Sequence, residues 1–422
     1  MKTLFNSGQV SERIKYIIVT IYVILILLTS FLFNSPQEII QGMKNIVLAP
    51  SVLVSDYFVV GNVGAALFNA SLLMIITVVL AIFNNLNING PIIAGIFTVG
   101  GFALFGKNIY NFWAILFGVY LYSAYKGEKF GNNLIIALFG TALAPLISLV
   151  SFGFGLDPVI GIIFGNLCGI IAGFSLVPLA YHYKKFHLDY DLYNLGFTAG
   201  IVGTLFMALF RSFGLESQSL SLIAAGYNRV FTIYCIIMFL SMIVIGFICN
   251  GLSFKGYKDL LKSTGKSPND FVQLNGFGIS FINMGIMGLI MLAYILLVGG
   301  EINGPGLGAL FTVIGFSAFG KHPRNAIPIT IGVFIGSMGT KWEVNSTSMI
   351  FAATFGTALA PVAGDFGVIA GIVAGFLHVS VVTNVGYLHG GVNLYNNGFS
   401  AGIVAAILAP FLMSIKKRKR ED

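Results

Sequence analysis

Two copies of the tripeptide Asn-Gly-Pro stand directly before apolar runs, from Asn89 to Pro91 and from Asn303 to Pro305. Asparagine caps helix N-termini, and proline suits the first turn, where its missing N–H costs no hydrogen bond. Such a helix start presents free N–H groups and the positive end of the helix dipole. Within a membrane it would hold an anionic or strongly polar solute. At the surface it would be an ordinary capped helix, and the sequence leaves both interpretations open.

Hydroxyl and ammonium groups follow in the same two segments. Thr98 and Thr312 lie within the helices that start there, where each hydroxyl would line a pore or bond back to its own helix. Lys107 and Lys321 end the segments after a Phe-Gly pair. A cation at this end complements the helix dipole and would snorkel to the membrane interface. The alternative is that the two lysines stand at opposite mouths of an anion pathway.

The longest unaltered repeat, Phe-Gly-Thr-Ala-Leu-Ala-Pro, ends at Pro145 and again at Pro361. Each proline removes the hydrogen-bond donor for the carbonyl four residues earlier, which belongs to Thr141 or Thr357. A free carbonyl beside a hydroxyl replaces part of a solute's hydration shell when it faces a cavity. The other interpretation is a proline kink that the same threonine satisfies.

Asparagines also introduce two short glycine-containing segments, at Asn194 and Asn396. Each forms a cap or turn, or, if the break lies in the membrane, offers a neutral donor and acceptor to a small polar solute. The predicted solute-binding residues are thus Asn89, Thr98, Thr141, Asn194, Asn303, Thr312, Thr357 and Asn396. The predicted hinge or mouth residues are Pro91, Lys107, Pro145, Pro305, Lys321 and Pro361. Asn69 and Asn283, matched within longer apolar runs, are expected to join helices rather than bind a ligand.

Enzyme motifs are weak in this chain. The Gly-Lys-Ser run at 265–267 has Leu260 where a Walker A motif requires its first glycine. A G-x-S-x-G run at 398–402 opens an apolar segment instead of a strand-to-helix elbow. The protein is therefore not expected to be an enzyme, and no catalytic residue is assigned.

Residues of the types that ligate metals cluster at one place in the sequence, and they are His182, His187, Asp189 and Asp191. In the matching stretch of the second copy only His389 remains, so we expect a solvated loop. The three cysteines lack metal-ligand spacing. Neither a metal nor another cofactor is expected.

Charged residues are missing from the central parts of the apolar segments, where the one embedded histidine is His378. Proton-coupled carriers usually keep an ionisable group in the membrane. This favours a facilitator, a channel or a carrier coupled to sodium. Asp56 and Asp270 precede apolar segments and are expected to be interfacial helix caps.

These motifs occur twice because the chain is duplicated. Residues 88–91 return at 302–305, 214 positions later, and residues 192–202 match 394–404, 202 positions later. A repeat of this length indicates a duplicated domain, not a solenoid. We therefore divide the chain into a first half, 1–214, and a second half, 215–422.

Composition places both halves in a bilayer. The chain is 57% hydrophobic and 9% charged, with a mean hydropathy of +0.91, whereas soluble domains carry about 25% charged residues. Its 52 glycines and 39 phenylalanines suit closely packed membrane helices. The net charge of +8 indicates membrane topology and attraction to anionic lipid, not nucleic-acid binding.

Each half contains seven apolar segments. Those of the first half are Tyr16–Phe33, Val63–Phe83, Pro91–Gly106, Phe112–Tyr125, Leu134–Val150, Val159–Leu179 and Phe197–Phe210. Those of the second are Val230–Ile248, Phe277–Leu297, Pro305–Gly320, Ala326–Met338, Met349–Val362, Val368–Val382 and Phe399–Met413. The third and fourth of each half fall short of the roughly 20 residues that a straight crossing needs. We expect them to be bent or re-entrant.

An odd number of crossings per half, seven or five, inverts the second half relative to the first. With both termini cytoplasmic, most basic loops and the tail at 416–420 fall on the cytoplasmic side, as the positive-inside rule requires. The sequence therefore predicts an all-α membrane protein of about 14 transmembrane or broken segments, arranged as two inverted-topology repeats.

The blocks Asn-Gly-Pro, Gly-Phe-x-x-Phe-Gly-Lys, Phe-Gly-Thr-Ala-Leu-Ala-Pro and Tyr-Asn-x-Gly-Phe resemble those of an uncharacterised family of bacterial integral membrane proteins, a domain of unknown function. The resemblance spans almost the whole chain and implies a multi-pass protein of the bacterial plasma membrane. The general scheme is also similar to urea-transporter-like inverted-repeat proteins, in architecture only.

Inverted repeats place equivalent segments around the bilayer midplane, where a solute is reached from either face. We therefore expect transport of a small polar or anionic solute through a site between the halves, by a facilitator, channel or secondary transporter. The alternative is a non-transporting scaffold or assembly factor. A polar cavity between the halves would favour transport over the scaffold hypothesis. The sequence also leaves open whether the protein forms a homo-oligomer.

Thr141→Val and Thr357→Val are each expected to reduce solute flux without preventing membrane insertion, because each removes a hydroxyl from the predicted pathway. Flux into vesicles that contain equal amounts of each variant checks this. Unchanged flux would remove both residues from the pathway.

Overall fold

The structure is a computed structural model that describes residues 10–217, 221–339 and 341–421, with side chains as far as Lys416. Within these ranges the regular elements are helices, and an isolated β-bridge joins Ser55 to Leu222. Ten of the described segments are long and apolar enough to cross a membrane, and two of them, Phe130–Gly153 and Thr347–Phe366, are broken helices. The prediction of an all-helical membrane protein is confirmed. The side chains at 417–420, which helped to orient the chain above, lie outside the description.

The first half contains α1 (Glu12–Phe33), α2 (Pro36–Leu48), α3 (Tyr57–Val60), α4 (Val63–Phe83), α5 (Gly90–Phe102), α6 (Trp113–Lys126), α7 (Phe130–Gly140), α8 (Ala144–Ser148), α9 (Pro158–Tyr183) and α10 (Asn194–Ser212). The second contains α11 (Asn228–Cys249), α12 (Tyr257–Leu260), α13 (Phe271–Leu274), α14 (Phe277–Leu297), α15 (Gly304–Phe316), α16 (Pro323–Met338), α17 (Thr347–Phe355), α18 (Ala360–Phe366), α19 (Val368–Val385) and α20 (Asn396–Glu421). Each predicted apolar segment corresponds to one helix or to a broken pair.

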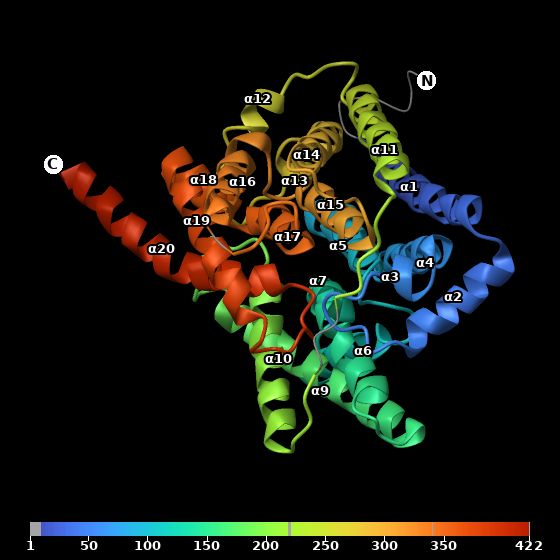
Figure 1. The fold of residues 1–422 in the computed structure, drawn as a ribbon. Helices are drawn as coiled ribbons and strands as arrows, with labels where there is room; N and C mark the ends of the chain where they lie inside the picture. Colours follow the sequence, from blue (N-terminus) through green and yellow to red (C-terminus); the bar gives the residue numbers. More distant parts are fainter. Residues whose placement is uncertain (1–9, 218–220, 340, 422) are drawn as a thin grey trace.

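The third and fourth segments of each half are short, as predicted. Helices α5 and α15 have 13 residues each, α6 has 14 and α16 has 16. Figure 1 shows α5 and α15 in the middle of the molecule, with longer helices around them. Since a straight crossing needs about 20 residues, the centre of the protein is built from helices that do not span a bilayer alone.

The equivalent helices α5 and α15 run antiparallel in direct contact. Gly90 at the start of α5 lies against Ala318, just beyond the end of α15, and Gly304 at the start of α15 lies against Leu104. A Cβ atom on Gly101 would approach the Gly308 carbonyl oxygen to 2.4 Å. The reverse approach, from Gly308 to the Gly101 carbonyl oxygen, would be 2.3 Å. Glycine is needed at this crossing because no side chain fits between the backbones.

Two asparagines hold the C-terminal ends of these central helices. The amide nitrogen of Asn69 donates to the carbonyls of Ala103 (2.8 Å) and Lys107 (2.9 Å). Asn283 makes the equivalent pair of bonds to Ser317 and Lys321, both 2.7 Å. Helix C-termini leave carbonyls without intrahelical donors, and a buried amide supplies two. The prediction that Asn69 and Asn283 join helices is confirmed.

The fifth segment of each half is broken at its proline. A 3-10 turn separates α7 from α8, and the N–H of Ala144 donates to the Thr141 carbonyl. The Thr357 carbonyl accepts from Ala360 in the same way. The carbonyl that each proline leaves without an α-helical donor is therefore engaged in the tighter turn.

The broken segments also bind loops of the opposite half. The carbonyl of Ala142 accepts from the N–H of Leu394, and the carbonyl of Ala358 accepts from the N–H of Leu192, both at 3.0 Å. These loops lead into α10 and α20, which meet at their N-terminal turns, where the rings of Phe197 and Phe399 lie 5.9 Å apart. The two halves are thus interleaved, not merely adjacent.

Gly308→Ala is expected to destabilise the protein by about 1–3 kcal/mol, because the added methyl group forces α5 and α15 apart. The midpoint of thermal unfolding in detergent measures this effect. Gly95→Ala on α5 is the matched control, since the nearest atom to its Cβ would be the flexible end of Leu138, at 3.2 Å. Equal midpoints for the two variants would contradict the close crossing.

Candidate functional site

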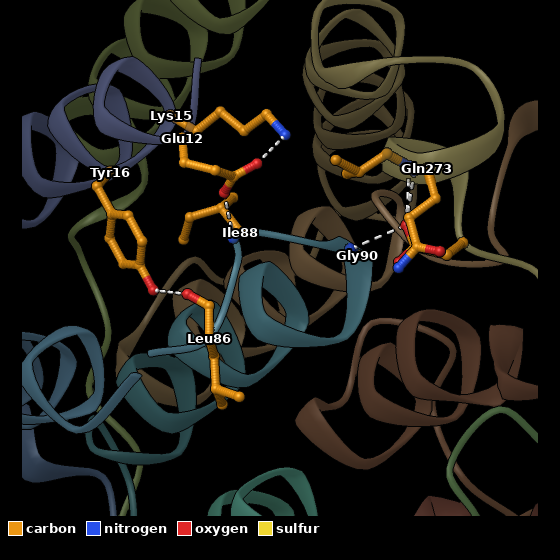
Figure 2. A network of polar contacts seen from close by, with 9 residues as sticks. Glu12, Lys15, Tyr16, Leu86, Ile88, Gly90 and Gln273 are labelled. Atoms are coloured by element: carbon orange, nitrogen blue, oxygen red, sulfur yellow. Dashed lines mark hydrogen bonds and ion pairs between the residues drawn. The ribbon is translucent and has the colours of Figure 1, made fainter. Parts of the chain in front are cut away.

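The N-terminal turns of the central helices are already occupied by carboxylates. The N–H of Gly90, which is labelled in Figure 2, donates to Asp270 of the second half at 3.0 Å. Asp56 of the first half accepts from Gly304. These helix ends favour negative charge, and the protein supplies it from the opposite half. The N-terminal positions that the sequence offered to an anionic solute are thus occupied by the protein's own carboxylates.

Both aspartates also cap short helices, as predicted. Asp56 accepts from the N–H of Phe58 in α3, and Asp270 accepts from that of Val272 in α13, both at 2.9 Å. Burial raises the pKa of the Asp56 carboxyl to about 6, although its N–H donors oppose this shift. Asp56 is buried and Asp270 is half-buried, and three backbone N–H groups donate to each carboxyl. Each aspartate therefore links the two halves through charge-assisted hydrogen bonds.

A polar cleft of about 850 Å³ lies beside the start of α5, and Asn89 is among its lining residues. Its charges are mutually satisfied: Lys15 contacts Glu12 at 2.6 Å, and the other Glu12 oxygen accepts from the N–H of Ile88 at 2.8 Å. Figure 2 shows this network together with the bond from Tyr16 to the Leu86 carbonyl. These contacts fix the loop before α5.

Lys107 and Lys321 are both completely buried. The interpretation of these residues as snorkelling cations is therefore wrong. They lie inside because α5 and α15 end in the protein interior, and the loops of the opposite half cover them. Burial of an ammonium group costs several kcal/mol unless a partner compensates, so the surroundings of each lysine matter.

Polar partners compensate the cost of burying the Lys321 ammonium group. Its Nζ donates to Tyr193 (2.5 Å) and to Thr357 Oγ1 (2.7 Å), and it lies 4.4 Å from the centroid of the Tyr193 ring. The Asp191 carboxylate, 4% exposed, is the acidic group that acts on this lysine. Lysine, tyrosine and aspartate therefore form one buried polar cluster drawn from both halves.

Lys107 has different surroundings. Its Nζ has no hydrogen-bond partner within the described part of the chain, although it lies 5.4 Å from the centroid of the Phe102 ring. At the place equivalent to Asp191 the second half has Asn393, whose side chain bonds to the N–H of Tyr395 and to the Gly196 carbonyl. The duplicated site is therefore charged differently in its two copies.

A cavity of about 200 Å³ lies between the halves beside this cluster. Asp191, Tyr193 and Asn194 line it from the first half, and Phe316 and Tyr395 line it from the second. Lys184 and Ser267 belong to the same lining, with Lys184 exposed. The cavity thus combines apolar rings with a few polar groups, as small-molecule sites do.

The structure corrects the sequence-based prediction for Asp191 and the nearby His187. Both are buried, so the prediction of a solvated loop is wrong for them. His187 Nε2 lies 2.9 Å from Asn194 Oδ1, and the pair His389 and Asn396 repeats this contact at 2.8 Å. No group of three or more metal-ligand residues that would hold an ion occurs among the described residues.

The predicted solute-binding residues do not gather in one place. Asn194 lines the cavity and Thr357 binds Lys321. Asn89, Asn303, Thr141 and Thr312 bond to backbone groups: the asparagines cap α5 and α15, and the threonine hydroxyls donate to the carbonyls of Leu138 and Gly308. Asn396 bonds to His389, whereas Thr98 Oγ1 is buried without a partner in the described chain.

Two tyrosines that sequence reasoning left unassigned are central to the site. Tyr193 and Tyr395 are completely enclosed, and their ring centroids lie 4.8 Å apart. The repeated Tyr-Asn-x-Gly-Phe block was the available signal. Its asparagine drew attention as the polar group, because the fold that brings the Tyr193 hydroxyl to buried Lys321 is not visible in the sequence.

Tyr193→Phe is expected to lower the free energy of unfolding by about 1–3 kcal/mol, because buried Lys321 loses an acceptor. Tyr395→Phe is the matched control, and we expect it to be nearly neutral in the absence of added solutes, since its hydroxyl has no partner among the described residues. Unfolding midpoints in detergent check both variants. A larger loss for Tyr395→Phe would contradict this assignment.

The chain matches the model of a known protein family. No curated protein and no solved structure matches the chain, so the architectural likeness to urea transporters stays a prediction. One family model, described as "Protein of unknown function (DUF1576)", matches residues 35–212 and 249–414. Because these ranges cover most of both halves, the chain belongs to this family.

Proposed function

We propose that the protein transports a small polar or anionic solute across the bacterial cell membrane, through the cavity between its halves, without catalysing a reaction. The observation that carries the proposal is the buried cluster of Lys321, Tyr193 and Asp191 beside that cavity. Ionisable groups inside membrane proteins are costly and typically mark solute or ion pathways. A scaffold would fill the same interface with apolar side chains.

The arrangement of the central helices supports an inverted repeat. Helices α5 and α15 are antiparallel, and the first N–H of each helix donates to a carboxylate of the opposite half. Two copies inserted in opposite orientations would make such reciprocal contacts around an axis in the membrane plane. Short or broken helices at that axis are the usual position of transporter sites.

The two ends of the pathway differ in the way expected for alternating access. On one side the backbone N–H of Leu53 donates to the Gly391 carbonyl at 3.0 Å. The equivalent positions on the other side are Ser267 and Asp189, which are joined through Lys184, at 3.2 Å to the hydroxyl and 3.5 Å to the carboxylate. We interpret the backbone-bonded side as the closed gate and the side held by Lys184, next to the cavity, as the open gate.

Flux into proteoliposomes tests the proposal, with a panel of urea, short carboxylates, amino acids, inorganic anions and nucleosides, with and without sodium. Lys321→Met is expected to reduce the flux of any transported solute by at least about tenfold, because charge-assisted contacts contribute about 1.5–3 kcal/mol. The control is Lys262→Met, which removes an exposed lysine paired with Asp259 and should leave flux unchanged.

Gel filtration must show that both variants remain monodisperse. If no solute crosses the bilayer, or if Lys321→Met transports as fast as Lys262→Met, the proposal fails. Absence of flux in every case would favour the alternative of a membrane scaffold.

A further inference from the structure

A second cleft, of about 290 Å³, lies at the N-terminal ends of α16 and α19. It shares no lining residue with the cavity between the halves. Its charged lining residues are Lys262 and Arg324, and none of the residues that line it is acidic. We call this cleft, whose lining also includes Ser263, His322 and Gly367, the basic cleft.

Two helices begin at the basic cleft. Helices α16 and α19 lie side by side (Figure 1) and run parallel, because Pro328 lies against Gly371, and Gly336, about two turns later, lies against Phe376. Both helices therefore direct the positive ends of their dipoles to the same place. At α19 the N-cap is Gly367, and no side chain caps the first turn. The N–H groups of that turn are left for solvent or for an anion.

Arg324 is the cation of this cleft that has no carboxylate partner. The ion pairs within the described chain do not include it. Lys262, in contrast, is paired with Asp259 at 2.8 Å. Asp365, which is close to the lining in sequence, is paired with Lys416 at 2.7 Å. The planar guanidinium of Arg324 is therefore available, and its geometry matches that of a phosphate group.

His322 adds a buried polar atom to the same lining. The residue is 1% exposed, and its Nδ1 has no partner among the described residues. The other ring nitrogen, Nε2, lies 2.8 Å from the Ser263 carbonyl oxygen and therefore carries a hydrogen. Buried polar atoms without a partner are rare in proteins. An anion in the cleft would favour the protonated imidazole, whose Nδ1–H is then a second donor.

The equivalent place in the first half is closed. The positions equivalent to Arg324 and Val368 are Tyr110 (324 minus 214) and Asn166 (368 minus 202). There Asn166 donates to the Tyr110 hydroxyl at 3.1 Å, and this hydroxyl lies 2.7 Å from Ser151 Oγ. The second half has a guanidinium and an apolar side chain in place of this bonded pair. The basic cleft is therefore a feature that the duplication did not copy.

Apolar side chains continue from the basic cleft along the outer faces of both helices. On α16, Ile327 and Ile331 are exposed and follow Arg324 at helical spacing. On α19, Ile369 and Val373 are exposed. Helix α19 is a candidate membrane span, so its first turn lies where an apolar crossing begins. A ligand that has an anionic head and apolar chains matches this combination of surfaces.

We propose that the basic cleft binds the phosphate group of an anionic phospholipid, whose acyl chains lie along α16 and α19. Arg324, protonated His322 and the first-turn N–H groups of α19 hold the phosphate. The exposed side chains beside them contact the acyl chains. This interaction lies outside the proposed pathway and does not depend on transport.

Lipid binding is measured on the full chain in detergent micelles, at constant ionic strength. A lipid that binds the folded state raises the apparent Tm saturably, and the dependence on its mole fraction gives an apparent affinity. Phosphatidylglycerol is expected to bind at least about tenfold more tightly than phosphatidylcholine with the same chains, because the trimethylammonium group of the latter would lie near Arg324. Inorganic phosphate, which has no acyl chains, is also expected to bind more weakly than phosphatidylglycerol.

Matched variants locate the binding site. Arg324→Met removes the cation and should weaken phosphatidylglycerol binding by about tenfold. Lys258→Met removes the same charge at an exposed position outside the lining and should leave the affinity unchanged. The double variant Arg324→Tyr and Val368→Asn introduces the residue pair of the first half, and should abolish lipid stabilisation while the protein still folds.

Equal affinity for the two phospholipids would overturn the proposal, and so would equal affinity of Arg324→Met and Lys258→Met for phosphatidylglycerol. Inorganic phosphate that binds as tightly as phosphatidylglycerol would also overturn it, because the ligand would then be a free anion. Solute flux plays no part in these measurements, so their outcome is independent of the proposed transport function.

Discussion

The architecture depends on the backbone contact between α5 and α15. At their crossing, Gly101 and Gly308 bring two helices so close that a single methyl group would collide with a carbonyl oxygen. In lipid, helices associate through such close packing because burial of apolar surface adds little there. The ends of both helices are then fixed by groups from elsewhere: Asp270 and Asp56 at the starts, and asparagine amides at the ends.

This crossing also determines where the charges lie. Because the two short helices end in the interior, Lys107 and Lys321 are carried into the protein and not to a membrane interface. The loops that cover them come from the opposite half and are held by backbone bonds to Ala142 and Ala358. A duplicated lysine thus becomes a buried site built jointly by both halves.

The duplication produces near-symmetry, and a few positions break it. Asp191 is a buried acidic residue that acts electrostatically on Lys321, whereas the equivalent residue of the second half is Asn393. His378, which bonds to Asn397 at 3.0 Å, stands where the first half has Leu176. In a low-dielectric interior one charge difference outweighs many apolar substitutions, so two similar halves hold chemically different sites.

Periodicity, composition and repeats were sufficient to predict the membrane-embedded helices, the short third and fourth segments, and the caps at Asp56 and Asp270. These features are local, because a cap or an apolar run depends on residues close together in the chain. Sequence alone also revealed the duplicated motifs, including the lysines. It placed Lys107 and Lys321 at an interface because a helix end looks the same whether it lies at the surface or inside.

Only the tertiary structure decided which polar groups are satisfied. Tyr193 and Lys321 are 128 residues apart in the chain, and Gly90 and Asp270 are 180 apart, so no local pattern relates them. The cost of a buried charge depends on the distance to its partners, and that distance exists only after the halves interleave. The sequence by itself therefore determined the helices and their polar residues. The fold determined that Lys321 finds two hydroxyl acceptors and that Lys107 finds no hydrogen-bond partner within the described chain.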